Sequence, residues 1–435
     1  MKRREFLKSS ALAASTIASP MRFTSTKDKI KLAILGTGWW GTDFLLPNIL
    51  SSSEFEIIGL CDVNSVALQN AKNLIEKAGN PTPRLFSSYQ EMFSMPGLQA
   101  VAIATPTHWH ALQFIAACEQ GLDVFLEKPI SYDIREGQAM LAAHKKARNV
   151  VQVDFPRVQL DTNDQVKSYI ESGAAGKILQ AKANIYWNEG SIVKNSIPEH
   201  LDYDAFCGPA PVVDYMTSLD GNTPQWRGQH DFSRGILADW GIHYIHNARK
   251  VLDLDLPSGV SAIGGTVKNF SQDNPDYLDV KFDFDDFPLH WSHKSWGAAL
   301  DSPDTTHGVF YYGEKATIYA SDLGWVVYPV DGSEKIVHGD VRFTAGESWM
   351  NNTMASIEKL FTEFAQGIRV KSNKNISATF KDAQKTTASV IYADVAFLAE
   401  SEIRIDPDSM DVLNNSQAQS RLKRDYRAPY QHPFT

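Results

Sequence analysis

Short, continuously apolar runs alternate with segments of helical periodicity between residues 29 and 155. Between the runs, apolar positions recur every three to four residues. Continuous apolar strands separated by helices are typical of a parallel, doubly wound sheet, because both faces of such a sheet are covered. We therefore predict a doubly wound α/β domain over 29–155. Its expected strands lie at 30–36, 55–64, 98–106, 122–129 and 149–156, and its expected helices at 42–52, 65–79, 108–121 and 133–148.

The pattern changes after residue 156. Alternating or apolar strand-like segments with Gly and Asp turns now dominate, which predicts a large, mostly antiparallel open sheet. These segments lie at 177–188, 259–270, 277–287, 289–297, 307–321 and 324–330, and two long helical patterns follow at 348–368 and 379–401. We predict an α+β domain over 156–415 and an extended, basic and aromatic tail over 416–435. That tail could also lie against a neighbouring surface.

Composition and net charge limit the classes of partner and substrate that the protein can have. A chain of 435 residues that is 43% hydrophobic and 21% charged has enough apolar surface for two cores. Its formal charge of −9 argues against nucleic acid or an anionic membrane as the main partner. A neutral sugar or polyol would not be repelled. The three cysteines form neither a disulfide framework nor a zinc pattern.

The first 28 residues differ from the rest of the chain. Arg3 and Arg4 precede Phe6-Leu7 and a mild apolar run that is too short to span a bilayer, so no stable membrane insertion is expected. This pattern resembles a twin-arginine signal, which predicts export of the folded protein to the periplasm. The alternative interpretation is a disordered basic tail.

A glycine-rich turn lies between the first strand and the first helix. In the motif G-x-G-x-x-G the glycines allow the backbone to approach a pyrophosphate, which the helix N-terminus stabilises. Asp62 follows the second strand at the spacing of a ribose-binding carboxylate, and it would repel a 2′-phosphate. We predict a Rossmann dinucleotide site that prefers NAD to NADP, although a tight turn without ligand is the alternative. The turn comprises Gly36, Thr37, Gly38, Trp39, Trp40 and Gly41, whose two tryptophans could cover the cofactor or simply pack.

Two further segments carry candidate chemistry. Lys128, between Glu127 and Pro129, lies at the carboxyl end of a predicted strand, where a lysine can hydrogen-bond a substrate oxygen. Asp239 and His243 are four residues apart, which places them on one face of a helix, so that the carboxylate can hold a proton-accepting histidine. A solvated Asp–His pair is the alternative.

These motifs occur in a characteristic order. G-x-G-x-x-G, A-T-P-T-H-W-H over 104–110, E-K-P over 127–129 and D-x-x-x-H over 239–243 together resemble the Gfo/Idh/MocA oxidoreductases. The stretches at 206–211 (F-C-G-P-A-P) and 231–252 resemble the secreted, sugar-handling branch of that family. The resemblance implies a Rossmann domain joined to an open antiparallel sheet that serves substrate and oligomer contacts, a homo-oligomer (dimer or tetramer), and a cis Lys128–Pro129 bond.

The resemblance also implies roles for individual residues. Lys128 would orient and polarise the reacting hydroxyl, His243 would be the base and Asp239 its partner. The nicotinamide side would be lined by Thr105, Pro106, His110 and Glu127. The stretch V-D-F-P-R-V at 153–158 departs from the family pattern, so Arg157 could reach the substrate or be an ordinary surface arginine. The other tentative substrate residues are Tyr186, His243 and Trp240, of which the last could stack on a sugar ring or belong to the core.

Three functions remain open from the sequence. The first is hydride transfer between tightly bound NAD and a sugar or polyol hydroxyl. The second is an NAD-dependent glycoside hydrolase that works by transient ring oxidation, elimination, hydration and re-reduction, with Tyr186, Tyr244 or His246 as its second base. The third is cofactor binding without catalysis. No metal is expected, because neither the H-x-H at 108–110 nor the H-x-x-H at 290–293 comes with a cluster of carboxylates or cysteines.

Overall fold

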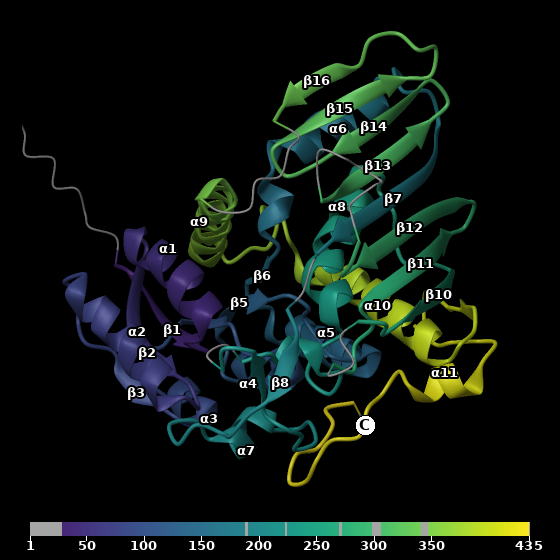
Figure 1. Ribbon diagram of the computed structural model, residues 1–435. Coiled ribbons are helices and arrows are strands. Elements are labelled where there is room, and N and C mark those ends of the chain that lie inside the picture. The colour runs from purple at the N-terminus through teal and green to yellow at the C-terminus, as the bar shows by residue number, and fades with distance from the viewer. Residues whose placement is uncertain are drawn as a thin grey trace, which may run out of the picture.

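The first sheet of the computed structural model is parallel and six-stranded, in the order β3-β2-β1-β4-β5-β6 (Figure 1). The structure describes residues 28–187, 190–221, 224–268, 272–297, 306–340 and 347–434. In the last of these ranges it describes side chains from residue 350 onward. The strands are β1 (Ile30–Leu35), β2 (Phe55–Cys61), β3 (Arg84–Phe86), β4 (Ala100–Ile103), β5 (Asp123–Glu127) and β6 (Val151–Asp154). The predicted Rossmann domain is confirmed. The apolar pattern did not predict β3, because this edge strand has only three residues and none of them is buried.

Helices cover both faces of this sheet, as expected of a doubly wound fold. One face packs against α3 (Tyr89–Phe93), α4 (Thr107–Glu119) and α5 (Ile134–Ala147). The other packs against α1 (Leu46–Ser51), α2 (Ser65–Lys77) and α9 (Glu347–Val370).

The helix α9 comes from the far end of the chain. Phe361 of α9 stacks on Phe125 of β5, with ring centroids 4.2 Å apart, and its neighbour Phe364 is also buried. Figure 1 shows α9 beside α1, although the expected domain division placed it in the second domain. Its apolar stripe covers part of a sheet face that the helices of residues 29–155 leave open.

The second sheet has nine strands in the order β16-β15-β14-β13-β7-β12-β11-β10-β17. All neighbours are antiparallel except β12 and β7, so the predicted mostly antiparallel sheet is confirmed. Its strands are β7 (Ile178–Tyr186), β10 (Gly259–Gly265), β11 (Tyr277–Phe284), β12 (Phe287–Lys294), β13 (His307–Gly313), β14 (Ala316–Ala320), β15 (Gly324–Pro329), β16 (Ile336–Gly339) and β17 (Ile403–Arg404).

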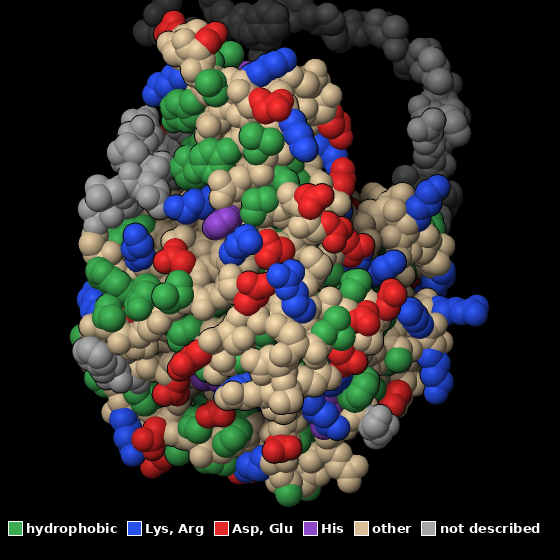
Figure 2. Space-filling view, turned by 90° about the vertical axis from the view of Figure 1, so that its right-hand side faces the viewer, with side chains coloured by type: hydrophobic (Ala, Val, Ile, Leu, Met, Phe, Trp, Pro, Cys, Tyr) green, Lys and Arg blue, Asp and Glu red, His purple; other side chains and the backbone are tan. Residues whose placement is uncertain are grey.

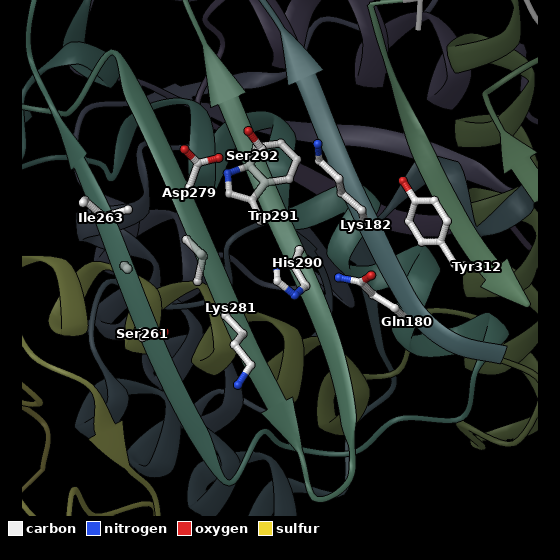
Figure 3. A pocket seen from close by; sticks show the side chains of 12 residues that line it. Gln180, Lys182, Ser261, Ile263, Asp279, Lys281, His290, Trp291, Ser292 and Tyr312 are labelled. Atoms are coloured by element: carbon white, nitrogen blue, oxygen red, sulfur yellow. The ribbon is translucent and has the colours of Figure 1, made fainter. Parts of the chain in front are cut away.

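One face of the second sheet is covered by helices and the other is open. The covering helices are α6 (Asp161–Glu171), α8 (Ile242–Val251) and α10 (Phe380–Leu398). Along β11, Leu278 and Val280 are buried whereas Asp279 and Lys281 are exposed, as expected of a sheet with one solvated face. Figure 3 shows polar side chains of β7, β11 and β12 projecting into a groove of about 450 Å³ on the open face. Seen from the right-hand side of Figure 1, the surface intersperses hydrophobic, basic and acidic side chains (Figure 2).

Shorter elements complete the fold. The π-helical segment η1 (Gly41–Leu45) follows β1, and the 3₁₀ turn η2 (Pro156–Gln159) leads from the first sheet toward the second. Between β7 and α8 lie β8 (Ile192–Lys194), the helix α7 (Tyr203–Cys207), β9 (Met216–Ser218), the 3₁₀ turn η3 (Trp226–Gly228) and the π-helical segment η4 (Leu237–Gly241). No helix among the described residues is both long enough and apolar enough to cross a membrane.

The predicted tail begins with a short helix, α11 (Ser416–Ser420), and continues as a segment that packs on the first domain. The guanidinium of Arg424 lies over the Tyr132 ring, 4.1 Å from its centroid, and donates to Glu136 Oε1 at 3.0 Å. Further along, His432 lies 3.0 Å from Asp133 Oδ2. The segment therefore lies against α5 of the same chain.

Candidate active site

The glycine turn follows β1, and its three glycines serve different purposes. Gly36 has a φ of +94°, and a Cβ built on it would lie 2.7 Å from the backbone carbon of Ala104. A Cβ on Gly41 would clash with the carbonyl oxygen of Gly36. A Cβ on Gly38 would meet nothing within 4 Å. Two glycines are therefore required by the fold, and the third borders open space that a pyrophosphate can enter.

Asp62 lies beside this turn, at the carboxyl end of β2. Its Oδ2 accepts hydrogen bonds from the backbone N–H of Thr37 at 2.6 Å and from the Thr37 hydroxyl at 3.1 Å, and its Oδ1 accepts from the Asn64 N–H at 2.8 Å. Burial raises the pKa of Asp62, although these donors oppose the rise. The predicted ribose-binding acid is thus positioned next to the glycine turn.

A cavity of about 520 Å³ lies beyond the carboxyl ends of β4, β5 and β6. Ligands of open α/β sheets bind at this edge. Residues far apart in the sequence line it together, including Trp39, Trp40, Thr105, Glu127, Lys128, Arg157, Trp187, Arg227, Asp239, Trp240 and His243.

Lys128 is held by one residue on the opposite wall. Its Nζ donates to the backbone oxygen of Asp239 at 2.7 Å and to Asp239 Oδ1 at 2.8 Å. Arg227 Nε lies 3.4 Å from the same Oδ1. Burial alone would raise the pKa of Asp239, but Lys128 and Arg227 hold it below its usual range. The Lys128–Pro129 bond is cis, as the resemblance implied.

The partner of Asp239 differs from the one that the helical spacing indicated. Asp239 binds Lys128 instead of His243, because residues 237–241 form a π-helical turn in which the Ile242 N–H bonds the Leu237 carbonyl. A π turn changes the spacing at which side chains share a face, and such turns are frequent at functional sites. The argument from an (i, i+4) pair therefore does not apply here.

His243 is buried at the cavity wall, only 6% exposed. Its Nδ1 has no hydrogen-bond partner among the described residues. Burial, followed by the charges of Lys128 and Arg157, holds the pKa of His243 well below its usual range. Its imidazole is therefore neutral at physiological pH and can accept a proton.

Aromatic rings form another wall of the cavity. Trp187 and Trp240 lie with their ring centroids 5.1 Å apart, and the Arg157 guanidinium lies 5.0 Å from the Trp240 centroid. Arg157 is also engaged by Asp322, which accepts from its Nη2 at 2.9 Å and from its Nε at 3.1 Å. Sequence reasoning missed Asp322, since nothing in its short turn between β14 and β15 indicates a partner 165 residues away.

The two tryptophans of the glycine turn have different environments. Trp39 is 55% exposed at the cavity mouth. Trp40 stacks on Phe44 with a centroid distance of 4.4 Å, and its Nε1 donates to Asp154 Oδ2 at 3.0 Å. Asp154 is a second site residue that was not predicted from the sequence. Its position directly after an apolar run, at the end of a predicted strand, could have indicated it.

Several predicted site residues lie outside the cavity. His110 is 1% exposed and bridges two backbone oxygens, those of Pro129 at 2.7 Å and Thr105 at 2.8 Å. Pro106 caps α4. The Tyr186 hydroxyl donates to the backbone oxygen of Gly297. His110 thus supports the cavity wall from behind.

One group of three potential metal ligands occurs among the described residues, formed by Asp133, Glu136 and His432. Its carboxylate oxygens accept hydrogen bonds from Arg424, from the Tyr426 hydroxyl and from backbone N–H groups. The group therefore attaches the C-terminal segment to α5.

Family models match nearly all of the first domain and about half of the second. Residues 30–155 match GFO_IDH_MocA, described as "Oxidoreductase family, NAD-binding Rossmann fold". Residues 160–286 match GFO_IDH_MocA_C2, described as "Oxidoreductase family, C-terminal alpha/beta domain".

Curated relatives match over shorter segments. A glycosyl hydrolase family 109 protein of Stenotrophomonas maltophilia is 34% identical over 29% of this chain and 29% of its own. An inositol 2-dehydrogenase of Rhodococcus jostii is 26% identical over 42% of this chain and 50% of its own. A levoglucosan dehydrogenase of Pseudarthrobacter phenanthrenivorans is 29% identical over 35% and 39%. The chain thus spans half or less of the length of these relatives.

Solved structures share the fold over nearly the whole chain. An oxidoreductase of Agrobacterium radiobacter in complex with NAD+, L-tartaric acid and magnesium aligns with a TM-score of 0.66, at 17% identity, over 87% of this chain and 98% of its own. An aldose-aldose oxidoreductase of Caulobacter crescentus complexed with glycerol aligns with a TM-score of 0.64, at 17% identity, over 87% and 100%. At these identities the likeness concerns the fold alone.

Proposed function

The chain belongs to the Gfo/Idh/MocA oxidoreductase family, and from that premise we propose that it transfers hydride between a bound nicotinamide cofactor and a sugar or polyol hydroxyl. The observation that carries this proposal is the juxtaposition of an ammonium group, a neutral histidine and aromatic rings in one cavity beyond the Rossmann strands.

The chain's own residues fit a dinucleotide. The open space at Gly38 would admit the pyrophosphate, and the lone pairs of Asp62 that Thr37 and Asn64 do not use could accept from the ribose hydroxyls. The carboxylate would repel a 2′-phosphate, so we propose NAD as the cofactor rather than NADP. The bound nicotinamide would accept hydride from the carbon that carries the reacting hydroxyl.

Lys128 and His243 would together allow the substrate hydroxyl to lose its proton. An ammonium group has three N–H donors, and Asp239 takes two of them, so the third is available to a substrate oxygen in the cavity. Its positive charge would stabilise the negative charge that develops on that oxygen. His243, held neutral, would accept the proton. The rings of Trp187 and Trp240 offer apolar faces to a sugar ring.

A redox-neutral glycosidase is the second candidate, favoured by the glycosyl hydrolase family 109 relative. That cycle needs a second base. The residues considered for this role are Tyr186, Tyr244 and His246, and none of them lines the described part of the cavity. Tyr244 donates to Asp322, and His246 is buried against Phe155 with ring centroids 4.2 Å apart. The structure therefore supports the oxidoreductase more directly.

The deciding experiment incubates the purified protein with NAD+ and a panel of sugars, polyols and glycosides, and follows NADH and released aglycone separately. We expect NADH with a free sugar or polyol. Lys128→Met should lower the rate about 10²-fold or more while NAD stays bound, because only the charge and the donor are removed. Full activity in Lys128→Met would refute the assignment, and aglycone release without net NADH would establish the glycosidase.

We also propose that the protein is exported folded, with its cofactor tightly held, and that it forms a homo-oligomer. The arginine pair that motivates export lies outside the described residues. A fusion of residues 1–30 to a folded reporter, with and without Arg3-Arg4→Lys-Lys, tests the export. Release of stoichiometric NAD on denaturation tests the tight binding, and light scattering tests the assembly.

A further inference from the structure

Two buried carboxyl groups lie side by side next to the proposed active site. Glu127 ends β5 and Asp154 ends β6, and the two residues are register partners on these parallel strands. Glu127 is 7% exposed and Asp154 is 0% exposed. The proton transfer proposed above uses neither of them.

Each of these buried carboxyls has one oxygen that receives no hydrogen bond from the described chain. Glu127 Oε2 accepts from the Lys128 backbone N–H at 3.2 Å, and Asp154 Oδ2 accepts from Trp40 Nε1 at 3.0 Å. No N–H or O–H group of the described chain donates to Glu127 Oε1 or to Asp154 Oδ1. Glu127 and Asp154 are register partners on adjacent strands, so each carboxyl is the neighbour that can satisfy the free oxygen of the other. Two carboxylates cannot satisfy each other, because each can only accept, so one of the two must carry a proton.

The surroundings favour one proton for the pair. Burial and the neighbouring Asp154 raise the pKa of Glu127, and burial raises that of Asp154. Lys128 is the cation that faces both, and it opposes this rise. Asp239 already neutralises much of that cation, and His243 is neutral. Full ionisation would thus place two negative charges in a buried site against one shared positive charge.

We propose that Glu127 and Asp154 share a single proton, and that this positioning pair holds Trp40 at the cavity and places one negative charge beside the nicotinamide ring. The second half of this statement rests on the proposed function, because it assumes a bound nicotinamide. The pair consequently favours the oxidised cofactor, whose ring is positively charged, over the reduced cofactor, whose ring is neutral.

The first test needs no cofactor. The carboxylic acid C=O stretch is measured by infrared difference spectroscopy at neutral pH on the full chain, the wild type against Asp154→Asn and against Glu127→Gln. We expect a protonated carboxyl band that either substitution removes and that the matched control Trp40→Phe, which retains both carboxyls, keeps. A band that is unchanged in both amide variants would overturn the proposal that the two carboxyls share a proton. If one of the variants does not fold, the other still provides the test.

The second test measures the charge. Dissociation constants of NAD+ and NADH are determined by calorimetry for the wild type and for Glu127→Gln/Asp154→Asn, which keeps the size and polarity of both side chains. We expect the ratio of the NAD+ constant to the NADH constant to rise about tenfold, equivalent to a potential about 30 mV higher for the bound two-electron couple.

The outcomes separate the two proposals. An unchanged ratio, with both cofactors bound, would refute the charge role and leave the proposed function intact. A wild-type protein that binds neither form would refute the proposed function and the charge role together. The infrared result would then still decide whether the pair shares a proton.

Discussion

His243 illustrates how position determines the state of a side chain. Its ring lies next to Lys128 and Arg157 in a buried wall, and both cations disfavour a positive charge on it. A histidine at the surface would be partly protonated near pH 6.5. In this cavity the imidazole stays neutral well below that pH, and therefore remains able to accept a proton.

This state has a kinetic signature. We expect the rate of the first turnover to stay level between about pH 7.5 and 6.5, since His243 is already neutral there. Any fall in the rate that is caused by protonation of His243 should occur only below about pH 6.5. His243→Asn should lower the rate about 10²- to 10⁴-fold while leaving cofactor affinity unchanged. Stopped-flow measurement of NADH formation across pH checks both, and a variant as fast as the wild type would exclude His243 as the base.

Some residues of the candidate site could be predicted from the sequence and others could not. Lys128, Gly36 and Asp62 follow directly from their place at strand ends, because the motif and the structural context are local. Asp154 and Asp322 act through partners that only the folded chain brings near, Trp40 and Arg157 respectively. No spacing rule within one segment could have found such pairs.

At the level of elements, the glycine turn and the π-helical segment after it form one unit. Gly41 starts η1, and the Leu46 N–H bonds back to the Gly41 carbonyl across the π turn. Pro47 follows at once, and its missing N–H would have left a gap in a regular helix at this point. The apolar pattern predicted a helix here, but it could not show that its first turn would be widened.

Two glycine substitutions separate folding from binding. Gly41→Ala should destabilise the protein by about 2 kcal/mol, because the new Cβ would clash with the Gly36 carbonyl oxygen. Gly38→Ala meets no protein atom within 4 Å, so its stability should change by less than about 0.5 kcal/mol. We nevertheless expect its NAD affinity to fall about tenfold or more, since the methyl group enters the pyrophosphate space.

Urea unfolding and calorimetric titration with NAD measure the two effects independently. A Gly38→Ala variant that binds NAD as tightly as the wild type would contradict the placement of the pyrophosphate at this turn.

The C-terminal segment is a second element whose packing can be tested. Glu136 is fully buried, and Arg424 is its cationic partner, itself 13% exposed at the side chain. Arg424→Ala should cost about 3–5 kcal/mol of unfolding free energy, because it leaves a buried carboxylate without its cation. The matched control is Arg427→Ala, whose partner Asp204 is 75% exposed, and its loss should be at most about 1 kcal/mol. Equal losses in urea unfolding would contradict this interpretation.

At the scale of the whole molecule, buried histidines set the response to acid. Burial lowers the pKa of His108 to about 3, that of His110 to about 4 and that of His293 to about 4. The unfolded chain protonates these rings near pH 6.5, whereas the folded chain does not. The unfolded state therefore binds more protons below about pH 6.5, and stability falls as the pH decreases.

The size of this effect can be bounded. Each such ring contributes up to about 1.4 kcal/mol per pH unit below about pH 6.5, until its folded pKa is reached. Carboxyls whose pKa is raised, such as Glu127 and Asp62, oppose the trend. Thermal unfolding at about pH 7.5, 6.5 and 5.5 should show a falling midpoint only across the lower interval, and a constant midpoint throughout would contradict the account.

The architecture of both sheets followed from hydrophobic periodicity, but the assignment of helices to sheets did not. The pattern at 348–368 predicted a helix correctly, and α9 spans Glu347–Val370. Its amphipathic stripe shows only that the helix needs an apolar partner. Which sheet the helix packs against is determined by tertiary contacts, and the local sequence of the helix does not show it.

The placement of α9 has a consequence for synthesis. A ribosome releases β1 to β6 long before it translates α9, so the nascent first domain carries an uncovered apolar strip that includes Phe125. Until residues near Phe361 emerge, that strip is a surface for chaperones or for aggregation. Translation arrest before α9 should therefore yield chains that adhere to chaperones, and completion of α9 should release them.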